Sequence, residues 1–325
     1  MVEIACDKLS GKNVLVTGAT GLIGSAVVDL LMHDGMGCEV YAAGRNVQRA
    51  HQRFEQYAVN SRFHFCTYDV NTPLTGDTTF HYIVHAASHA GPQFFATDPV
   101  GVMTANILGT KHLLDYGREH GLERFLYVSS GEVYGDGDVD EWSETDSGYV
   151  DCMALRSCYP TSKRAAENLC VAYNHQYGVE TVVVRPCHTY GPYFTENDTR
   201  AYAQFVRKIR NHEDVVLKSS GEQFRSWLYV KDCASAILTV LLKGKNGEAY
   251  NVADEKSCIT IRELAETIAS IGGVNVVFDL PSDVEKIGFS VIHKAVFNTN
   301  KLRKLGWSPH YSLIDGLTET INHVK

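Results

Sequence analysis

A tyrosine and a lysine four residues apart indicate the chemistry that this chain could perform. Tyr159 and Lys163 lie in the segment Tyr-Pro-Thr-Ser-Lys, and residues at this spacing share one face of a helix. A nearby ammonium group favours the phenolate of a tyrosine, whose unperturbed pKa is about 10. We therefore expect Lys163 to lower the pKa of Tyr159, which could then take a proton from an alcohol while a hydride leaves the same carbon. Ordinary exposed pairs on a helix show the same spacing, so other parts of the sequence must distinguish a catalytic pair from an exposed one.

A glycine-rich turn supplies a second chemical signal. The apolar residues 14–17 are followed by Gly18, Gly21 and Gly24 and then by an apolar helical pattern. Glycines let the backbone approach a pyrophosphate, and a helix N-terminus offers free N–H groups and a positive dipole to hold it. The order of strand, turn and helix predicts a dinucleotide-binding site in preference to a plain tight turn.

The elements that would position these residues alternate along the first half of the chain. Apolar segments of strand length are separated by segments with helical periodicity, which predicts an α/β fold with a doubly wound parallel sheet. The predicted strands are residues 13–17, 39–43, 62–67, 82–86, 125–129 and 181–185. The predicted helices lie near residues 22–34, 46–57, 99–120 and 160–177.

After Pro186 the pattern changes to glycine, proline and aromatic residues. We expect a smaller lobe here that covers the carboxyl edge of the sheet. It would hold a helix near 199–211, the segment 219–230 and a helix-and-turn region from residue 261, while a strand at 249–252 returns to the sheet. The predicted sheet domain is residues 10–186 plus about 230–255. The predicted substrate lobe is discontinuous and comprises residues 187–229 and 256–325.

Composition argues against several classes of protein. The 325 residues carry a net charge of −8 and no basic block, so binding to nucleic acid has no electrostatic support. No apolar run is long enough to span a membrane, and residues 1–10 do not form a signal peptide pattern, so we expect a cytoplasmic protein. The nine cysteines are scattered and lack Cys-x-x-Cys, which argues against a disulfide framework and against a metal site.

Several further motifs give the chain a recognisable pattern. They are the glycine turn, Tyr68-Asp69-Val70, His85-Ala86-Ala87-Ser88, Asn106-x-x-Gly109-Thr110, Val-Ser-Ser-Gly-Glu-Val-Tyr-Gly at 128–135, Tyr159 with Lys163, Arg185-Pro186 and Tyr190-Gly191-Pro192. Together they resemble an extended short-chain dehydrogenase/reductase of the nucleotide-sugar epimerase and dehydratase group, over nearly the whole chain. The resemblance implies a Rossmann domain, a tightly bound NAD(P), a nucleotide-sugar substrate and a homodimer formed through helices near 99–120 and 156–177.

The resemblance also implies which residues contact the cofactor. They are Gly18, Thr20, Gly21, Leu22, Ile23, Gly24, Asp69, Val70, Ala86, Ala87, Ser88, Asn106, Tyr159, Lys163 and Pro186. Where an NAD-binding member usually ends its second strand with Asp, this chain has Gly44 followed by Arg45. Arg45 suits a 2′-phosphate, but stacking on adenine or facing solvent fits as well, so NAD and NADP both remain open.

The resemblance assigns catalytic roles to four residues. Ser130 would bind the substrate hydroxyl, with Ser129 as a backbone-capping hydroxyl. Lys163 would also bind the nicotinamide ribose. Dehydratases carry Asp-Glu and UDP-glucuronate decarboxylases Ser-Glu where this chain has Gly131-Glu132. We expect Glu132 to be a buried carboxylate with a raised pKa that exchanges a proton beside a transient ketone, and the alternative is a surface ion pair.

Two stretches resemble the decarboxylase branch of the family. Arg156-Ser-Cys-Tyr159 with Lys163-Arg164-x-x-Glu167 is one, and Gln223-x-Arg225 is the other. Arg225 would bind the diphosphate or a substrate carboxylate, and the alternative is a structural pair with Asp232. His188 is predicted to contact substrate, although the family usually has Asn there.

The expected function is modification of a nucleotide sugar through transient oxidation at C4 by bound NAD(P). Decarboxylation of a UDP-hexuronate is the most specific form of this hypothesis. The alternatives are a 4-epimerase and an NADPH-dependent 4-ketoreductase. A non-catalytic dinucleotide-binding regulator is a further alternative, which the intact set of Ser130, Tyr159 and Lys163 disfavours.

Overall fold

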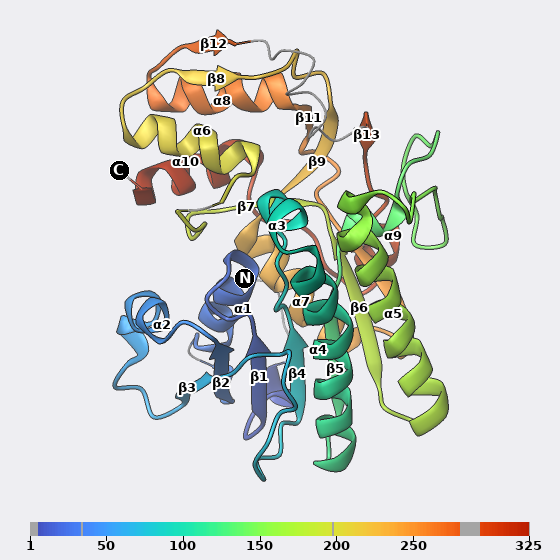
Figure 1. Ribbon diagram of the computed structural model, residues 1–325. Helices are drawn as coiled ribbons and strands as arrows, with labels where there is room; N and C mark the ends of the chain where they lie inside the picture. Colours follow the sequence, from blue (N-terminus) through green and yellow to red (C-terminus); the bar gives the residue numbers. More distant parts are fainter. Residues whose placement is uncertain (1–5, 34, 197, 280–292, 325) are drawn as a thin grey trace.

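A seven-stranded parallel sheet forms the centre of the protein (Figure 1). The computed structural model describes residues 6–33, 35–196, 198–279 and 293–324. The strand order is β10-β6-β5-β4-β1-β2-β3, so the chain winds outward from β1 in both directions. The strands are β1 (Asn13–Thr17), β2 (Glu39–Gly44), β3 (Phe63–Thr67), β4 (Tyr82–His85), β5 (Arg124–Val128), β6 (Thr181–Pro186) and β10 (Ala249–Val252). The predicted α/β doubly wound fold is confirmed.

Helices cover both faces of this sheet because its strands are apolar on both sides. In β5, Phe125 and Tyr127 pack into the core beneath two long helices, whereas Leu126 and Val128 belong to the core on the opposite face. This alternation follows from the two-residue period of a strand. The helices over the first face are α4 (Pro99–Glu119) and α5 (Cys158–Tyr177), and those over the second are α1 (Leu22–Leu31) and α7 (Val230–Lys243). Two shorter helices, α2 (Val47–Arg53) and α3 (Pro92–Thr97), follow β2 and β4.

The smaller lobe lies over the carboxyl ends of the central strands (Figure 1). Its largest sheet is built on β9, which pairs with β7, β11 and β13, and a second pair joins β8 to β12. The strands are β7 (His188–Tyr190), β8 (Val215–Leu217), β9 (Phe224–Tyr229), β11 (Cys258–Thr260), β12 (Val276–Phe278) and β13 (Lys294–Ala295). The helices are α6 (Ala201–Arg210), α8 (Ile261–Gly272) and α10 (Leu313–Val324), whereas α9 (Asn300–Arg303) packs against β10 of the central sheet.

Most predicted elements lie within two or three residues of the observed ones, and the strand at 249–252 does return to the sheet as β10. Helix α7 was not predicted. Its residues 230–243 are almost all buried, although Lys231, Ser235 and Thr239 recur at the four-residue spacing of a helix. Residues 280–292 of the predicted lobe lie outside the described residues, and the two domain boundaries stay a prediction.

Three properties of the described residues bear on function. No helix among them is long and apolar enough to cross a membrane. The cysteines described there, from Cys38 to Cys258, are free thiols. In the same part of the chain no group of three or more His, Cys, Asp or Glu side chains could hold a metal ion.

Candidate active site

The glycine turn after β1 is packed against the end of β4. Gly18 has a φ of 67°, and a Cβ atom there would lie 2.7 Å from the backbone of Ala86 and Ala87. A Cβ atom on Gly24 would lie 2.3 Å from the carbonyl oxygen of Gly18. Both contacts are shorter than any side chain tolerates, so glycine is required for this turn to fold.

The turn leaves a helix N-terminus ready to hold an anion. Helix α1 begins at Leu22, and Gly21 before it provides no side-chain cap. The N–H groups of the first helical turn therefore have no acceptor within the helix, and they combine with the helix dipole to bind phosphate. The buried hydroxyl of Ser88 also has no hydrogen-bond partner within the described residues. These groups fit the pyrophosphate and nicotinamide half of NAD(P), and the individual cofactor contacts stay a prediction.

The adenosine end of the predicted cofactor site lies at the ends of β2 and β3. Arg45 follows β2, and its side chain is 56% exposed. Its Nη2 atom lies 3.2 Å from Nε2 of His89, and its Nη1 atom lies 3.9 Å from Oδ2 of Asp69. The guanidinium group of Arg45 is exposed enough either to bind a 2′-phosphate or to face solvent. Both interpretations of Arg45 remain hypotheses.

Helix α5 places the Tyr159 and Lys163 side chains at the carboxyl edge of the sheet. Both residues are buried, and Nζ of Lys163 donates a hydrogen bond to the carbonyl of Val128 at 2.8 Å and lies 5.7 Å from the centre of the Tyr159 ring. The start of α5 is tied to α4, because Asn106 donates to Ser162 at 3.0 Å and Ser162 donates to the carbonyl of Tyr159 at 3.0 Å. Asn106 therefore supports the tyrosine, and its predicted cofactor contact stays a prediction.

The pKa values of this pair differ from the expectation. Burial raises the pKa of Tyr159, and the charge of Glu132 raises it further, while a hydrogen bond with Ser130 opposes the shift. Burial also lowers the pKa of Lys163, to about 7. The expectation that Lys163 leaves Tyr159 with a lowered pKa is therefore wrong for the protein alone. Both groups lose hydration when they are buried, and this loss is the largest cause of each shift.

Ser130 rather than Ser129 caps the segment after β5. The Ser130 hydroxyl accepts the N–H of Glu132 at 3.2 Å at the start of a single 3₁₀ turn, Gly131–Tyr134. The Ser129 hydroxyl is buried without a hydrogen-bond partner in the described part of the chain, so the capping role expected for Ser129 was wrong. A Cβ atom on Gly131 would lie 2.4 Å from the ring of Phe297, which explains why this chain has glycine there.

Glu132 forms a bidentate ion pair with Arg156. Its Oε2 and Oε1 atoms accept hydrogen bonds from Nη1 and Nη2 at 3.0 and 3.1 Å. The two side chains are 28% and 41% exposed, so the expectation of a buried, unpaired carboxylate was wrong and the ion-pair alternative is observed. The pair lies inside the site, because Glu132 affects the pKa values of both Tyr159 and Arg225.

His188 lies among three arginines. His188 is exposed in β7, yet the pKa of its ring is lowered by desolvation within the site and by the charges of Arg225, Arg200 and Arg156. Arg225 is 4% exposed and donates to the carbonyls of Phe224 and His293, both at 3.0 Å.

Asp232 was the alternative partner for Arg225. It accepts the N–H groups of His310 and Tyr311 at 3.0 and 2.9 Å.

The structure therefore brings the predicted catalytic and substrate residues together. We call the following side chains the charged cluster: Glu132, Arg156, Tyr159, His188, Arg200 and Arg225. Sequence reasoning did not assign a role to Arg156 or Arg200. The first was visible only as part of the Arg-x-x-Tyr pattern, whereas the second, which pairs with Asp198 just before α6, had no spacing signal. Phe95 was also missed, and its ring stacks on Tyr159 at 4.9 Å.

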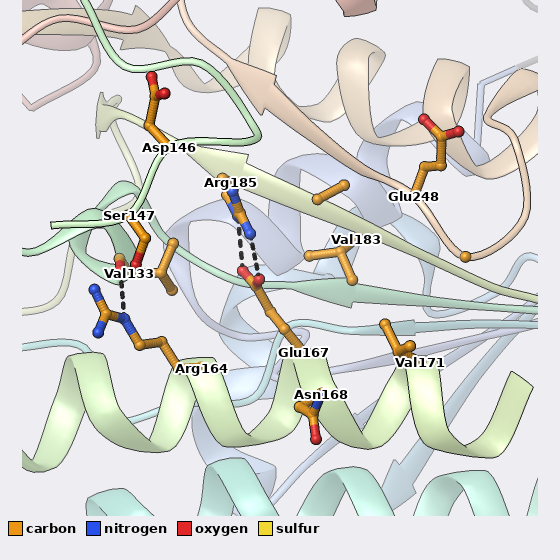
Figure 2. A pocket seen from close by; sticks show the side chains of 12 residues that line it. Val133, Asp146, Ser147, Arg164, Glu167, Asn168, Val171, Val183, Arg185 and Glu248 are labelled. Atoms are coloured by element: carbon orange, nitrogen blue, oxygen red, sulfur yellow. Dashed lines mark hydrogen bonds and ion pairs between the residues drawn. The ribbon is translucent and has the colours of Figure 1, made fainter. Parts of the chain in front are cut away.

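A separate cavity of about 350 Å³ lies between α5 and the edge strands β6 and β10 (Figure 2). Arg185 of the Arg-Pro motif lines it and pairs with Glu167 through bonds of 3.0 and 2.7 Å. Arg164, also in this wall, donates to the carbonyl of Val133 at 2.6 Å. These motif residues thus join α5 to the sheet, which is a structural role.

Comparison with known proteins places these features in context. The sequence model of the NAD dependent epimerase/dehydratase family matches residues 14–253. UDP-glucuronic acid decarboxylase 1 of Xenopus tropicalis is 31% identical over 317 residues, which cover 97% of this chain and 72% of that protein. UDP-glucuronic acid decarboxylase 6 of Arabidopsis thaliana is 31% identical, with 95% and 87% covered. The structure of DesIV, a dTDP-glucose 4,6-dehydratase from Streptomyces venezuelae with NAD bound, matches with a TM-score of 0.83 at 25% identity over 96% of each chain.

Proposed function

The chain belongs to the NAD-dependent epimerase/dehydratase family, and on this premise we propose that it decarboxylates a UDP-hexuronate such as UDP-glucuronate. The observation that carries the proposal is the charged cluster: Arg156 lies over the Phe95 ring that stacks on Tyr159, and the charges of Arg156, Arg200 and Arg225 all lower the pKa of His188. A UDP-hexuronate brings a diphosphate and a carboxylate to the site, and arginine forks match both groups. The relatives that act on UDP-glucuronic acid by name support the same substrate.

The residues of α5 and of the segment after β5 would manage the first proton. NAD(P), when bound, supplies the acceptor for a hydride from C4 of the sugar and returns it at the end of the cycle. Ser130 would hold the C4 hydroxyl, and Tyr159, bonded to Ser130, would take its proton. Lys163, anchored on the Val128 carbonyl, would place its positive charge beside the phenolate that forms.

Glu132 would manage the second proton. A ketone at C4 makes the C6 carboxylate a β-keto acid, so the C5–C6 bond breaks, CO₂ leaves and the electron pair remains as an enolate. A proton from solvent, passed by Glu132, then forms the new C5–H bond. Glu132 is close enough to influence Tyr159, which supports this role.

Two other activities make different use of the same residues. A 4-epimerase needs no proton exchange on carbon, and the closed pair between Glu132 and Arg156 favours this alternative. A 4-ketoreductase would consume NADPH, and the position of Arg45 near His89 favours NADP. Tight retention of the cofactor belongs to the decarboxylase and epimerase proposals, because both leave it unchanged.

We also propose that the protein is a homodimer joined through α4 and α5. The two helices pack against each other, and Leu108, an apolar residue on α4, is 43% exposed. Sedimentation of the wild type at twice the monomer mass is the expected result. A monomer at all concentrations would contradict the proposal.

The variant Glu132→Gln tests the proposed function. Ketone formation should proceed, because Ser130, Tyr159 and Lys163 remain, but turnover should stall before product. The expected result is reduced nicotinamide that accumulates in a single turnover and persists, because CO₂ can leave but the enolate is protonated slowly at C5 and the ketone is not reduced. In heavy water the wild type should place deuterium at C5 of the product. Full activity of Glu132→Gln without deuterium in the product would contradict decarboxylation and favour the epimerase.

A further inference from the structure

The ion pair between Glu132 and Arg156 is placed where a substrate can compete for it. Both carboxylate oxygens are held by one guanidinium group at 3.0 and 3.1 Å, yet both side chains reach solvent. Exposed ion pairs contribute little net free energy, because each partner is also well hydrated. A second carboxylate that enters the site can therefore replace Glu132 at Arg156.

Arg156 lies close to the reacting groups. Its charge lowers the pKa values of Tyr159, His188 and Arg225. Its guanidinium carbon lies 5.7 Å from the centre of the Phe95 ring, and the same ring stacks on Tyr159. A sugar held against Tyr159 would therefore lie within reach of Arg156.

The other two arginines of the charged cluster are held differently. Arg225 is almost fully buried and donates to backbone carbonyls, which a substrate does not displace. Arg200 is bonded to Asp198, whose side chain is 7% exposed. Arg156 combines solvent access with a partner that is itself a proposed proton carrier, which makes it the arginine best placed to change partners.

We propose that Arg156 exchanges partners during the reaction: it leaves Glu132 to bind the carboxylate of the hexuronate, and this exchange frees Glu132 to handle the proton at C5. The inference rests on the proposed function. Both carboxylate oxygens of Glu132 accept hydrogen bonds from Arg156 while the pair is closed, so neither oxygen is free to face C5 of the sugar. The substrate carboxylate offers the same bidentate geometry, so the exchange conserves both hydrogen bonds.

The ion pair between Glu132 and Arg156 forms again at the end of the reaction. When the C5–C6 bond breaks, the carboxylate leaves as neutral CO₂, and its electron pair stays on the sugar until the proton from Glu132 forms the C5–H bond. Arg156 then has no anionic partner on the product. It returns to Glu132, which has given up its proton and is again a carboxylate.

Binding measurements test this proposal without catalysis. The background is the variant Tyr159→Phe loaded with NAD(P), in which the ligands do not react. Calorimetric titrations compare UDP-glucuronate with UDP-glucose. Arg156→Gln should weaken binding of UDP-glucuronate by roughly ten-fold or more, since it removes two charge-assisted hydrogen bonds, and should leave UDP-glucose unchanged. Arg156→Lys should recover part of the loss, because it keeps the charge but not the fork.

Glu132→Gln supplies the reciprocal measurement. Removal of the competing protein carboxylate should make UDP-glucuronate bind more tightly and should not affect UDP-glucose. A matched control is Arg210→Gln on α6, because Arg210 forms a bidentate pair of similar arginine exposure with Glu196, at 2.9 and 3.2 Å. This control should change neither affinity.

Three outcomes would overturn the partner exchange. One is equal weakening of both ligands by Arg156→Gln, which would mean that Arg156 only shapes the site. Another is weaker binding of UDP-glucuronate to Glu132→Gln, which would mean that the pair stays closed in the complex. The third is a background protein that does not prefer UDP-glucuronate to UDP-glucose. Release of CO₂ from UDP-glucuronate by the wild type would leave the proposed function intact in each case, so the two failures are distinguishable.

Discussion

The cofactor end of the site consists mainly of backbone atoms, whereas the substrate end consists of charged side chains. At the cofactor end, the glycine turn and the first turn of α1 present backbone atoms from one continuous segment, residues 18–24. At the substrate end, the charged cluster collects side chains from β7, β9, α5 and three connecting segments. Binding at the cofactor end depends on the shape of the backbone, whereas binding at the substrate end depends on which charged side chains pair. Substitutions at the two ends should therefore fail in different ways.

The largest expected effect lies at the substrate end. Tyr159→Phe removes the proton acceptor and leaves the stacking on Phe95 possible, so turnover should fall roughly 100- to 10,000-fold while the fold and NAD(P) binding persist. Turnover assays and dinucleotide titration measure the two properties. Tyr177→Phe, an exposed tyrosine at the end of the same helix, is the control and should keep full activity. Normal turnover of Tyr159→Phe would remove this residue from the chemistry.

A glycine substitution tests the cofactor end. Gly18→Ala adds a Cβ atom 2.7 Å from the backbone of Ala86 and forces alanine into a left-handed conformation. The free energy of unfolding should fall by roughly 2–5 kcal/mol, and NAD(P) binding should be lost. Gly178→Ala is the matched control, with a φ of 72° but no atom within 4 Å, and should cost on the order of 1 kcal/mol. Urea unfolding compares the two, and equal losses would show that the close approach does not matter.

A third prediction concerns Arg45, a charged side chain at the cofactor end of the site. If Arg45 binds a 2′-phosphate, Arg45→Ala should weaken NADP binding by roughly ten-fold or more and NAD binding much less. Fluorescence titration with each reduced dinucleotide measures both constants. Equal losses for the two cofactors would mean that Arg45 stacks on adenine and does not discriminate.

The last prediction is a pH dependence of stability from Lys163. Its pKa in the folded protein is about 7, below the ordinary 10.5, so between these values the unfolded chain binds a proton that the folded chain does not. Stability of the dinucleotide-free protein should thus rise with pH in this window, by at most about 1.4 kcal/mol per pH unit, and this gain is lost as pH falls through about 7.

Urea unfolding at several pH values measures this slope. Lys163→Met should flatten it between pH 7 and 9, while a substitution of the exposed Lys218 should not. An unchanged slope in Lys163→Met would assign the dependence to other groups.

The sequence by itself determined the fold class, the glycine turn and the Tyr159–Lys163 pair. Each of these signals is local: strand and helix periods, the spacing of glycines, and two residues on one face of a helix. It also placed Ser130, Glu132, His188 and Arg225 in one site, through their resemblance to family motifs. Helix α7 was not predicted, although the four-residue spacing of Lys231, Ser235 and Thr239 was a local signal for it.

Only the tertiary structure decided how the charges pair. Glu132 was expected to be an unpaired buried acid, yet it holds Arg156, which lies 24 positions further along the chain. Arg200 joins the same cluster from a loop that no motif marks. Burial is the largest cause of the pKa shifts of Tyr159 and Lys163, and burial exists only in the folded protein. Backbone geometry depends mainly on neighbouring residues. The electrostatics of the site depends on distances between residues far apart in the chain, and only folding sets these distances.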